Sequence, residues 1–582
     1  MSQVWQVADP VPAPAAAQFP AYPPALLQLL WNRGLRTQEA MDAYLAPDWN
    51  RDTFPPSLFR NMDAAVSRVF DALSKGDMIA VHGDYDADGV SGSAVLLTAM
   101  RDICRSLVSP NGGAAYDEKK LTFYLPHREK EGYGVAIPTV ETLVRERNAK
   151  LMITVDCGIS NKPAIDRAKE LGMDTIVCDH HTMPAELPER AILIHPLVPG
   201  ETYPNKHLCG TGVAFKLASA LIHEARKRGG TLPDGYEKWL LDLVAIATVT
   251  DVMPLVGENR ALEAYGLKVL NKTRRLGLKK LLELAGSKGP VDTTTIGFQI
   301  GPRLNAAGRM EHASGALELL LAEDDLAAAH FANHLQEANE ARQEASERMY
   351  QAAKASIGDA GDQKLIIAAG EGWSPGLVGL VASKLVNDYR RPVLVVGHEN
   401  GHHVGSGRSV PGYDITATVR AAAEHMDKFG GHPQACGFSV TGADKFALAS
   451  QAMRAYAELN LTAEQMVPTL AVDAEIALED ADWALLEHLE KLQPFGEGNR
   501  PPVFCARGLL VSGVDPVGAD GKHLRLAVRS PRGKIVRMIG FRFGHLLGTL
   551  RLGQTVDVAF ELGVNEWNGR RDIQFKITDL KL

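Results

Sequence analysis

Residues 78–91, MIAVHGDYDADGVS, pass from an apolar segment directly into aspartates at alternate positions, Asp84, Asp86 and Asp88. The apolar segment predicts a short buried strand, and the run that follows the aspartates predicts a helix. A strand that ends in carboxylates and turns into a helix is typical of a ligand site at the carboxyl edge of an open α/β sheet. The stretch therefore predicts an α/β fold with a site in this turn.

The same aspartates also fit the D-x-D-x-D-G opening of a calcium-binding EF-hand loop. The twelfth position of that loop is a glutamate that binds calcium through both oxygens, whereas here it is Val95. An EF-hand also needs a helix before the loop, where this sequence predicts a strand. We therefore reject the EF-hand and keep a solvated acidic turn as the alternative without a function.

The whole chain sets wider limits. Its 582 residues predict about three or four domains. The formal net charge of -8 argues against a generally basic nucleic-acid coat, although a basic cleft can lie on an acidic protein. Six cysteines without a C-x-x-C pair favour reduced thiols over a disulfide scaffold or a zinc ribbon. With neither a signal-peptide pattern nor a membrane-spanning run, we expect a cytoplasmic protein without membrane contact.

The order of patterns along the chain predicts its domains. Strand-like runs alternate with helical patterns between about residues 60 and 260, as in βαβ units with a mostly parallel sheet. Residues 320–357 contain neither Gly nor Pro and predict one long helix. A second, smaller α/β unit follows, and short strands after about residue 468 predict a β-barrel. The Pro/Ala-rich residues 8–24 predict an extended arm that lies on the surface or is partly disordered, and residues 109–120 predict a polar surface loop.

We place the boundaries accordingly. The expected parts are an N-terminal arm and helical segment at 1–50, a catalytic domain at 51–320, a connecting long helix at 321–358, a smaller α/β domain at 359–460 and a barrel at 461–582.

Other predicted strands also end in acidic or imidazole side chains. Asp156 follows LMITV, and the triplet 179–181 (DHH) follows DTIVC, while Asp251 follows an apolar run that fits helix or strand. Carboxylates that converge at one sheet edge repel each other unless cations neutralise them. Mixed carboxylate and imidazole ligation suits Mn²⁺, with Mg²⁺ or Zn²⁺ as alternatives. The pattern therefore predicts two divalent cations, the usual apparatus for hydrolysis at phosphorus.

These acidic motifs resemble those of a known superfamily. HGDYDADG (82–89), VDCG (155–158), DHH (179–181) and TDV (250–252) are similar to the four motifs of the DHH phosphoesterase superfamily. PHREKEGYG, GPRLNAAGR, GSGRSVPGYDI, GGHPQACGFS and PFGEGNRPPVF resemble in particular its RecJ family of bacterial 5′→3′ exonucleases. The resemblance implies a mostly parallel DHH-type sheet domain, joined by a long helix to a smaller α/β DHH-associated domain and followed by an OB-fold β-barrel.

The family pattern also implies how the two cations are held. One aspartate bridges them, and the remaining ligands come from the strand ends. The first cation takes Asp86 and Asp156, with His82 assisting, and the second takes Asp88, Asp156, His180 and Asp251.

Three further side chains act without being ligands in this pattern. His181 faces the scissile phosphate as a hydrogen-bond donor or acid, and Asp84 and Asp179 orient the ligands. We therefore count His181, Asp156 and Asp84 as the candidate catalytic residues.

The remaining motifs imply substrate contacts. Guanidinium groups bind phosphate through paired donors, a tyrosine can stack on a base, and glycines admit a close phosphate. Ordinary salt bridges, a core tyrosine and simple turns are the alternatives. The candidates are Arg128, Tyr133, Arg303, Asn305, Arg309, Ser406, Arg408, Gly431 and His432. Ser406 and Arg408 are our candidate 5′-phosphate pocket.

The barrel adds weaker candidates for backbone and stacking contacts. They are Lys522, His523, Arg525, Trp567, Arg570 and Arg571.

The resemblance implies a metal-dependent exonuclease that degrades single-stranded DNA from its 5′ end to mononucleotides, in repair and recombination. Its partners would be single-stranded DNA, a single-strand-binding protein and a helicase, and the chain would act as a monomer. Two alternatives remain. One is a phosphodiesterase for cyclic dinucleotides or short oligonucleotides, and the other is a non-catalytic subunit of a replication complex.

Overall fold

The computed structural model describes the chain except residues 1–2, 109–114, 129, 519 and 568–569. Half of the loop predicted at 109–120 and the side chains of Trp567 and Arg570 therefore lie outside the described residues. Contacts divide the chain into two compact units. The barrel unit comprises 1–47, 462–495 and 499–582, and the large unit comprises 48–461 and 496–498. No described helix is long and apolar enough to cross a membrane.

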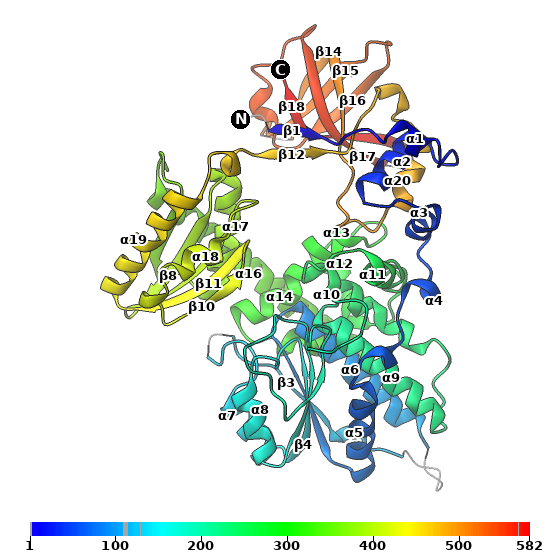
Figure 1. The fold of residues 1–582 in the computed structure, drawn as a ribbon, viewed down its shortest axis with the longest axis vertical. Helices are drawn as coiled ribbons and strands as arrows, with labels where there is room; N and C mark the ends of the chain where they lie inside the picture. The colour runs from blue at the N-terminus through cyan, green and yellow to red at the C-terminus, as the bar shows by residue number, and fades with distance from the viewer. Residues whose placement is uncertain (1–2, 109–114, 129, 519, 568–569) are drawn as a thin grey trace. The chain divides into compact units, whose positions relative to one another are not determined.

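The first sheet of the large unit has five strands (Figure 1). Its order is β3-β2-β4-β5-β6 and every pair is parallel, which confirms the predicted α/β class. Because parallel strands point the same way, their carboxyl ends share one edge. The strands are β2 (Met78–Gly83), β3 (Leu121–Tyr124), β4 (Ala149–Val155), β5 (Asp174–Cys178) and β6 (Ile192–Ile194).

Helices cover both faces of this sheet (Figure 1). One face packs against α5 (Met62–Lys75), α6 (Ala87–Ser106) and α9 (Gly210–Lys227), and the other against α7 (Ile137–Arg145) and α8 (Lys162–Glu170). The strands are therefore apolar on both faces, as expected for a covered parallel sheet. This burial leaves the carboxyl edge as the place where polar side chains gather.

A helical layer follows the sheet in the sequence. The run around residues 243–250, which fitted helix or strand, is helix α10. The motif GPRLNAAGR is α14, entered through a π-helical turn at Ile296–Ile300. The helices are α10 (Leu241–Thr250), α11 (Gly257–Leu270), α12 (Leu276–Leu284), α13 (Thr293–Thr295), α14 (Gly301–Met310) and α15 (Ser314–Leu321).

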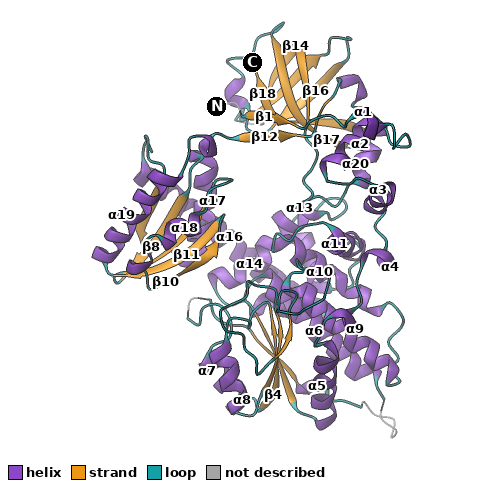
Figure 2. Cartoon of the chain, in the orientation of Figure 1, coloured by secondary structure: helices purple, strands orange, loops and turns teal. Residues whose placement is uncertain are grey.

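The predicted long helix is confirmed as α16 (Asp325–Ile357), although it begins at residue 325 and not at 320, where the preceding helix is still present. Asp324 caps it, accepting a hydrogen bond of 2.8 Å from the Ala327 N–H. A smaller mixed sheet of order β10-β11-β9-β8-β7 follows, with helices packed on it (Figure 2). Its elements are β7 (Ile366–Glu371), α17 (Pro375–Tyr389), β8 (Val393–Glu399), β9 (His402–Arg408), α18 (Ile415–Arg420), β10 (Lys428–His432), β11 (Ala435–Thr441) and α19 (Ala443–Asn460).

The barrel unit contains the predicted β-barrel. Its strands pair in the order β14-β15-β16-β18-β17, and β17 pairs back with β14, which closes the barrel. Closure removes the exposed strand edges. The elements are β12 (Thr469–Val472), β13 (Ala474–Glu475), α20 (Trp483–Lys491), β14 (Phe504–Val517), β15 (His523–Arg529), β16 (Ile535–Gly540), β17 (Thr555–Trp567) and β18 (Arg570–Lys581).

The structure departs from the extended surface arm predicted at residues 8–24 at two places, a helical turn and a buried aromatic ring. Residues 13–16 form a helical turn, α1, which tolerates Pro14 because the first N–H groups of a helix have no partner within it. Phe19 is buried in the core of the barrel. Trp5, on a strand that pairs parallel with β12, donates 2.7 Å to Oδ2 of Asp579. The remaining N-terminal elements are β1 (Val4–Val7), α2 (Pro24–Asn32), α3 (Gln38–Leu45) and, in the large unit, α4 (Trp49–Asp52).

Candidate metal centre and substrate cavity

The polar side chains predicted at strand ends do converge. The strands β2, β4 and β5 are neighbours in the sheet, and the residues directly after them are Asp84, Asp156 and Asp179, respectively. The chain therefore brings three carboxylates to one edge by topology alone. All three are buried.

Two more carboxylates are fixed by helix N-termini. Asp86 caps α6 and accepts hydrogen bonds from the N–H groups of Asp88 (2.9 Å) and Gly89 (3.2 Å). Asp88 accepts 2.7 Å hydrogen bonds from Gly210 and Thr211, at the start of α9. The partial positive charge of a helix N-terminus stabilises an anion there. Both carboxylates are thus held without a basic side chain.

Close packing around these turns requires glycine. A Cβ on Gly89 would lie 2.5 Å from the backbone of Asp84, and one on Gly210 would lie 2.6 Å from the Cβ of Asp156. Neither distance is tolerable between real atoms. The helix starts can therefore approach the strand ends only with these two residues.

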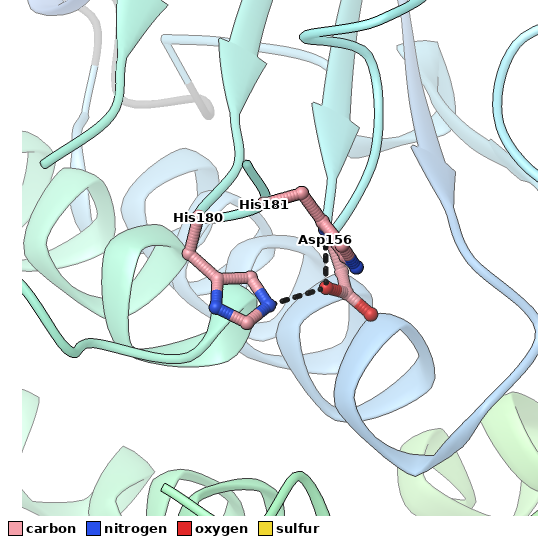
Figure 3. A group of neighbouring side chains, drawn as sticks. All are labelled: Asp156, His180 and His181. Atoms are coloured by element: carbon pink, nitrogen blue, oxygen red, sulfur yellow. Dashed lines mark hydrogen bonds and ion pairs between the residues drawn. The ribbon is translucent and has the colours of Figure 1, made fainter. Parts of the chain in front are cut away.

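The His180 ring lies close to three carboxylates, of which Figure 3 draws Asp156. Its Nε2 lies 3.1 Å from Oδ1 of Asp156, 3.4 Å from Oδ2 of Asp251 and 3.8 Å from Oδ2 of Asp88. Asp251 caps the end of α10, so a helix rather than a strand delivers it. The ligand set predicted for the second cation is therefore assembled in one place.

A second group surrounds the other side of Asp156. One ligand atom each from Asp84, Asp86 and Asp156 lies within 4.8 Å of the others. Oδ1 of Asp84 is buried and has no hydrogen-bond partner among the described residues. Asp84, predicted to orient ligands, is thus placed as a direct ligand would be.

The charge balance of the site calls for cations. Burial, followed by repulsion from Asp88, raises the pKa of Asp156 well above its ordinary value. Burial and the neighbouring Asp88 and Asp86 raise the pKa of Asp251 to about 9. Oxygen ligands with one imidazole suit Mn²⁺ and Mg²⁺. The residues present therefore fit two divalent cations.

The imidazole of His181 is held in one tautomer. Its Nδ1 lies 2.8 Å from Oδ1 of Asp179, which can only accept, so Nδ1 carries a proton. Although burial opposes it, this hydrogen bond raises the pKa of His181 above its ordinary value. Nε2 is then the position that can take or release a proton. Figure 3 shows the ring directed toward Asp156.

His82 is the predicted ligand that the structure supports least. It is fully buried, and its Nδ1 lies 3.6 Å from Sγ of Cys157. Burial lowers its pKa to about 4, so the ring is neutral. It belongs to none of the three ligand groups formed by described residues. Its Nε2 has no described partner.

The backbone of Asp156 is strained. Its φ is +60°, in the left-handed region that few residues other than glycine adopt. Such a conformation costs about 1–3 kcal/mol and persists only where the surroundings enforce it. Aspartate tolerates the region better than most residues. The surroundings of Asp156 therefore enforce this conformation.

Four of the predicted substrate residues line one cavity of about 860 Å³ in the large unit. Arg128 and Arg309 reach it from one side, and Ser406 and Arg408 on β9 from the other. Nη1 of Arg408 donates 2.8 Å to Oγ of Ser406. No described carboxylate forms an ion pair with any of the three arginines. Three guanidinium groups against one lining carboxylate, that of Glu399, make the cavity suited to an anion.

The other five candidates do not line this cavity. Asn305 accepts 2.7 Å from the Ala87 N–H and so fixes the start of α6. Arg303 turns to α16, where its Nε donates 2.8 Å to Gln336. His432 is exposed on β10, beside Gly431 with φ of +144°. Tyr133 contacts His181 instead.

Sequence reasoning missed several contributors. The backbone N–H groups of Gly210 and Thr211 hold Asp88, and peptide groups carry no side-chain signal. His195 follows β6, and its Nε2 lies 3.0 Å from the His181 carbonyl oxygen. Its position after a strand was a signal that could have been used. Trp373 lines the cavity next to Ser374.

The barrel candidates form no cluster of free cations among the described residues. Lys522 pairs with Asp520, and Nδ1 of His523 accepts 3.0 Å from the Arg542 N–H. Arg571 lies over the ring of Trp483, 5.7 Å from its centroid, and Arg525 is exposed.

Matches to known proteins cover nearly the whole chain. Family models match in three segments: the DHH family N-terminal domain at residues 78–248, the DHHA1 domain at 362–459 and the RecJ OB domain at 472–579. The sequence is 36% identical over 560 residues to the single-stranded-DNA-specific exonuclease RecJ of Bacillus subtilis (strain 168). That match covers 96% of this chain and 68% of the relative.

Solved structures agree. The crystal structure of RecJ in complex with Mn²⁺ from Thermus thermophilus matches with a TM-score of 0.82 and 29% identity, over 100% of this chain and 79% of that one. The complex of RecJ with Mg²⁺ from the same organism matches with a TM-score of 0.76 and 27% identity, over 100% and 78%.

Proposed function

Because the chain belongs to the RecJ family of the DHH superfamily, we propose that it degrades single-stranded DNA in the 5′→3′ direction and releases mononucleotides. The chain is a metal-dependent single-stranded-DNA exonuclease. The observation that carries the proposal is the intact cluster around Asp156 and His180, together with a matched DHHA1 domain and OB barrel. A non-catalytic relative has no use for the cluster, and a cyclic dinucleotide needs no such barrel.

The ligand atoms suggest how two cations are held. Asp88, His180 and Asp251 would hold one, and Asp84 and Asp86 the other, with Asp156 shared between them. Bound there, divalent cations polarise a phosphodiester and lower the pKa of water. We assign no ligand role to His82, whose ring is outside these groups. Mn²⁺ is our first choice and Mg²⁺ the second.

The chain's own side chains then complete the hydrolysis. The oxygen of water bonds to phosphorus and loses a proton to solvent, and the bond from phosphorus to the 3′ oxygen of the terminal nucleotide breaks. His181 supplies the leaving 3′ oxygen with a proton from Nε2, while Asp179 holds its Nδ1. The shortened strand begins again with a 5′-phosphate. Each turnover therefore regenerates the same kind of end.

The cavity supports a proposal for how the 5′ end is recognised. A terminal phosphate carries more charge than an internal diester, so Arg408 with Ser406 would prefer it. Arg128 and Arg309 would hold the next part of the strand. The barrel would bind the strand further along, as OB folds do. A role in repair and recombination, partnership with a single-strand-binding protein and a helicase, monomeric action and a cytoplasmic location belong to this proposal.

A product time course tests the proposal. End-labelled single-stranded DNA, duplex DNA and a cyclic dinucleotide are each incubated with Mn²⁺ or Mg²⁺. We expect mononucleotides from the 5′ end of the single strand, and little from the other two substrates. Faster hydrolysis of the cyclic dinucleotide, or release from the 3′ end, would contradict the proposal.

A further inference from the structure

The backbone on both sides of Tyr133 fixes the direction of its side chain. Tyr133 lies between Gly132 and Gly134, whose φ values are +80° and +86°. Residues with a Cβ rarely adopt such values. A Cβ on Gly134 would also lie 2.4 Å from Oδ1 of Asn161. The sequence GYG therefore turns the backbone twice and sets the direction of the tyrosine side chain.

The loop is anchored independently of that side chain. The carboxylate of Glu131 accepts 2.7 Å from the Tyr124 hydroxyl, 2.7 Å from the His127 N–H and 3.0 Å from the Thr139 hydroxyl. These bonds attach the loop to β3 and α7. The Tyr133 hydroxyl is not needed to keep the loop in place, so its own contacts call for a separate explanation.

The Tyr133 hydroxyl contacts two groups of the metal centre at once. It donates 3.0 Å to the carbonyl oxygen of Asp156, and its oxygen lies 2.9 Å from Nδ1 of His181. Nδ1 carries one proton, which Asp179 accepts, so the tyrosine oxygen shares that proton; the same oxygen also lies 3.3 Å from Nε2. One hydroxyl thus connects the backbone of Asp156 to the ring of His181.

These contacts explain how the strained backbone of Asp156 is maintained. The carbonyl that accepts from Tyr133 belongs to the residue with φ of +60°. We propose that Tyr133 is a positioning residue, whose hydroxyl holds Asp156 and His181 in their reacting arrangement, and that it is not a platform for a base. This inference rests on the proposed exonuclease function for its kinetic arm only.

The competing role is base stacking, because Tyr133 is 44% exposed. Its ring lies 5.2 Å from the His181 ring, measured between centroids, and is tilted by 59°. Stacking needs the ring but not the hydroxyl, whereas positioning needs the hydroxyl. The two roles therefore predict different results for variants that remove one and keep the other.

The test compares Tyr133→Phe, Tyr133→Leu and the control Tyr124→Phe. Tyr124→Phe also removes a hydroxyl from this region, but that hydroxyl bonds to Glu131 and not to the site. We measure kcat and KM on a 5′-phosphorylated single strand, and Mn²⁺ affinity by isothermal titration calorimetry. Removing a group that orients metal ligands lowers activity or metal affinity by about ten- to a hundredfold. We expect this loss in kcat for both Tyr133 variants, with KM unchanged and weaker Mn²⁺ binding.

Three outcomes would overturn the inference. In the first, Tyr133→Phe is unchanged while Tyr133→Leu raises KM, which is the pattern of stacking. In the second, Tyr124→Phe loses as much activity as Tyr133→Phe, which makes the hydroxyl a tie within the loop. In the third, Mn²⁺ affinity stays the same in every variant. A wild-type protein that does not degrade the strand would reject the proposed function instead, and the calorimetry would still test Tyr133.

Discussion

The metal centre and the substrate cavity are assembled by different means. Asp84, Asp156 and Asp179 reach the centre because three parallel strands end side by side. The cavity instead collects Arg309 from a helix and Arg408 from a second sheet. Topology fixes the first arrangement, so strand patterns reveal it. Packing between distant elements fixes the second, so a motif can name its residues without saying which way they face.

The largest expected effect lies in the metal centre. Asp156→Asn removes the shared carboxylate but keeps a residue that tolerates the left-handed backbone. Hydrolysis should fall to the level of the metal-free protein, while single-strand binding persists. Losing one of several repelling carboxylates should also raise the melting temperature of the metal-free protein. Activity near that of the wild type in Mn²⁺ would exclude a shared ligand.

The next prediction compares Arg408 with Arg303, two arginines that the sequence motifs both predict to bind substrate. Arg408→Ala removes a cavity donor, whereas Arg303→Ala alters a contact with Gln336 on α16. Hydrogen bonds to charged groups contribute about 1.5–3 kcal/mol, so Arg408→Ala should lower kcat/KM roughly ten- to a hundredfold on 5′-phosphorylated strands. The loss should be smaller on 5′-hydroxyl strands, and Arg303→Ala should affect both ends little.

The measurement is kcat/KM for both ends at two salt concentrations. A charge that only steers DNA acts on both substrates alike and weakens with salt. Equal losses on the two ends for Arg408→Ala would therefore remove the 5′-phosphate pocket. If Arg303→Ala lowered kcat/KM as much as Arg408→Ala does, lining the cavity would not distinguish the residues that bind DNA.

The smallest effect concerns the barrel unit. Because residues 1–47 pack with the barrel, the deletion removes them together with residues 462–582, which include residues 496–498 of the large unit. Chemistry on short strands should persist, since the metal centre and cavity lie in the large unit. Stacking contributes about 1–3 kcal/mol per base, so affinity for long strands should fall tenfold or more. Circular dichroism must first show that the large unit is folded; unchanged affinity would then exclude the barrel from binding.

These contrasts show how far the sequence can be taken. The strand-end aspartates, the long helix at 325–357 and the barrel strands follow from local periodicity. Helical spacing could also have separated Asn305 and Arg309, which share a face, from Arg303, which does not. The hydrogen bond from Trp5 to Asp579 joins residues 574 positions apart, and no local sequence pattern predicts it. The sequence also does not predict the hydrogen bonds from the N–H groups of Gly210 and Thr211, because every residue except proline has such a group.

The division of the chain into five parts remains a prediction, and the contacts group it differently. The sequence predicts an N-terminal arm and helical segment at 1–50, as a part separate from the barrel. The segment's buried residues Phe19, Leu29 and Leu30 instead share a core with strands β14 to β18. An apolar pattern identifies a helix that must be covered, but it does not identify the partner that covers it.

Anomalous scattering from crystals grown with Mn²⁺ tests the central claim most directly. We predict two peaks in the large unit. One should lie among Asp88, His180 and Asp251, the other beside Asp84 and Asp86, and both should be within ligand distance of Asp156. A single peak, or two peaks that do not share Asp156, would contradict the account.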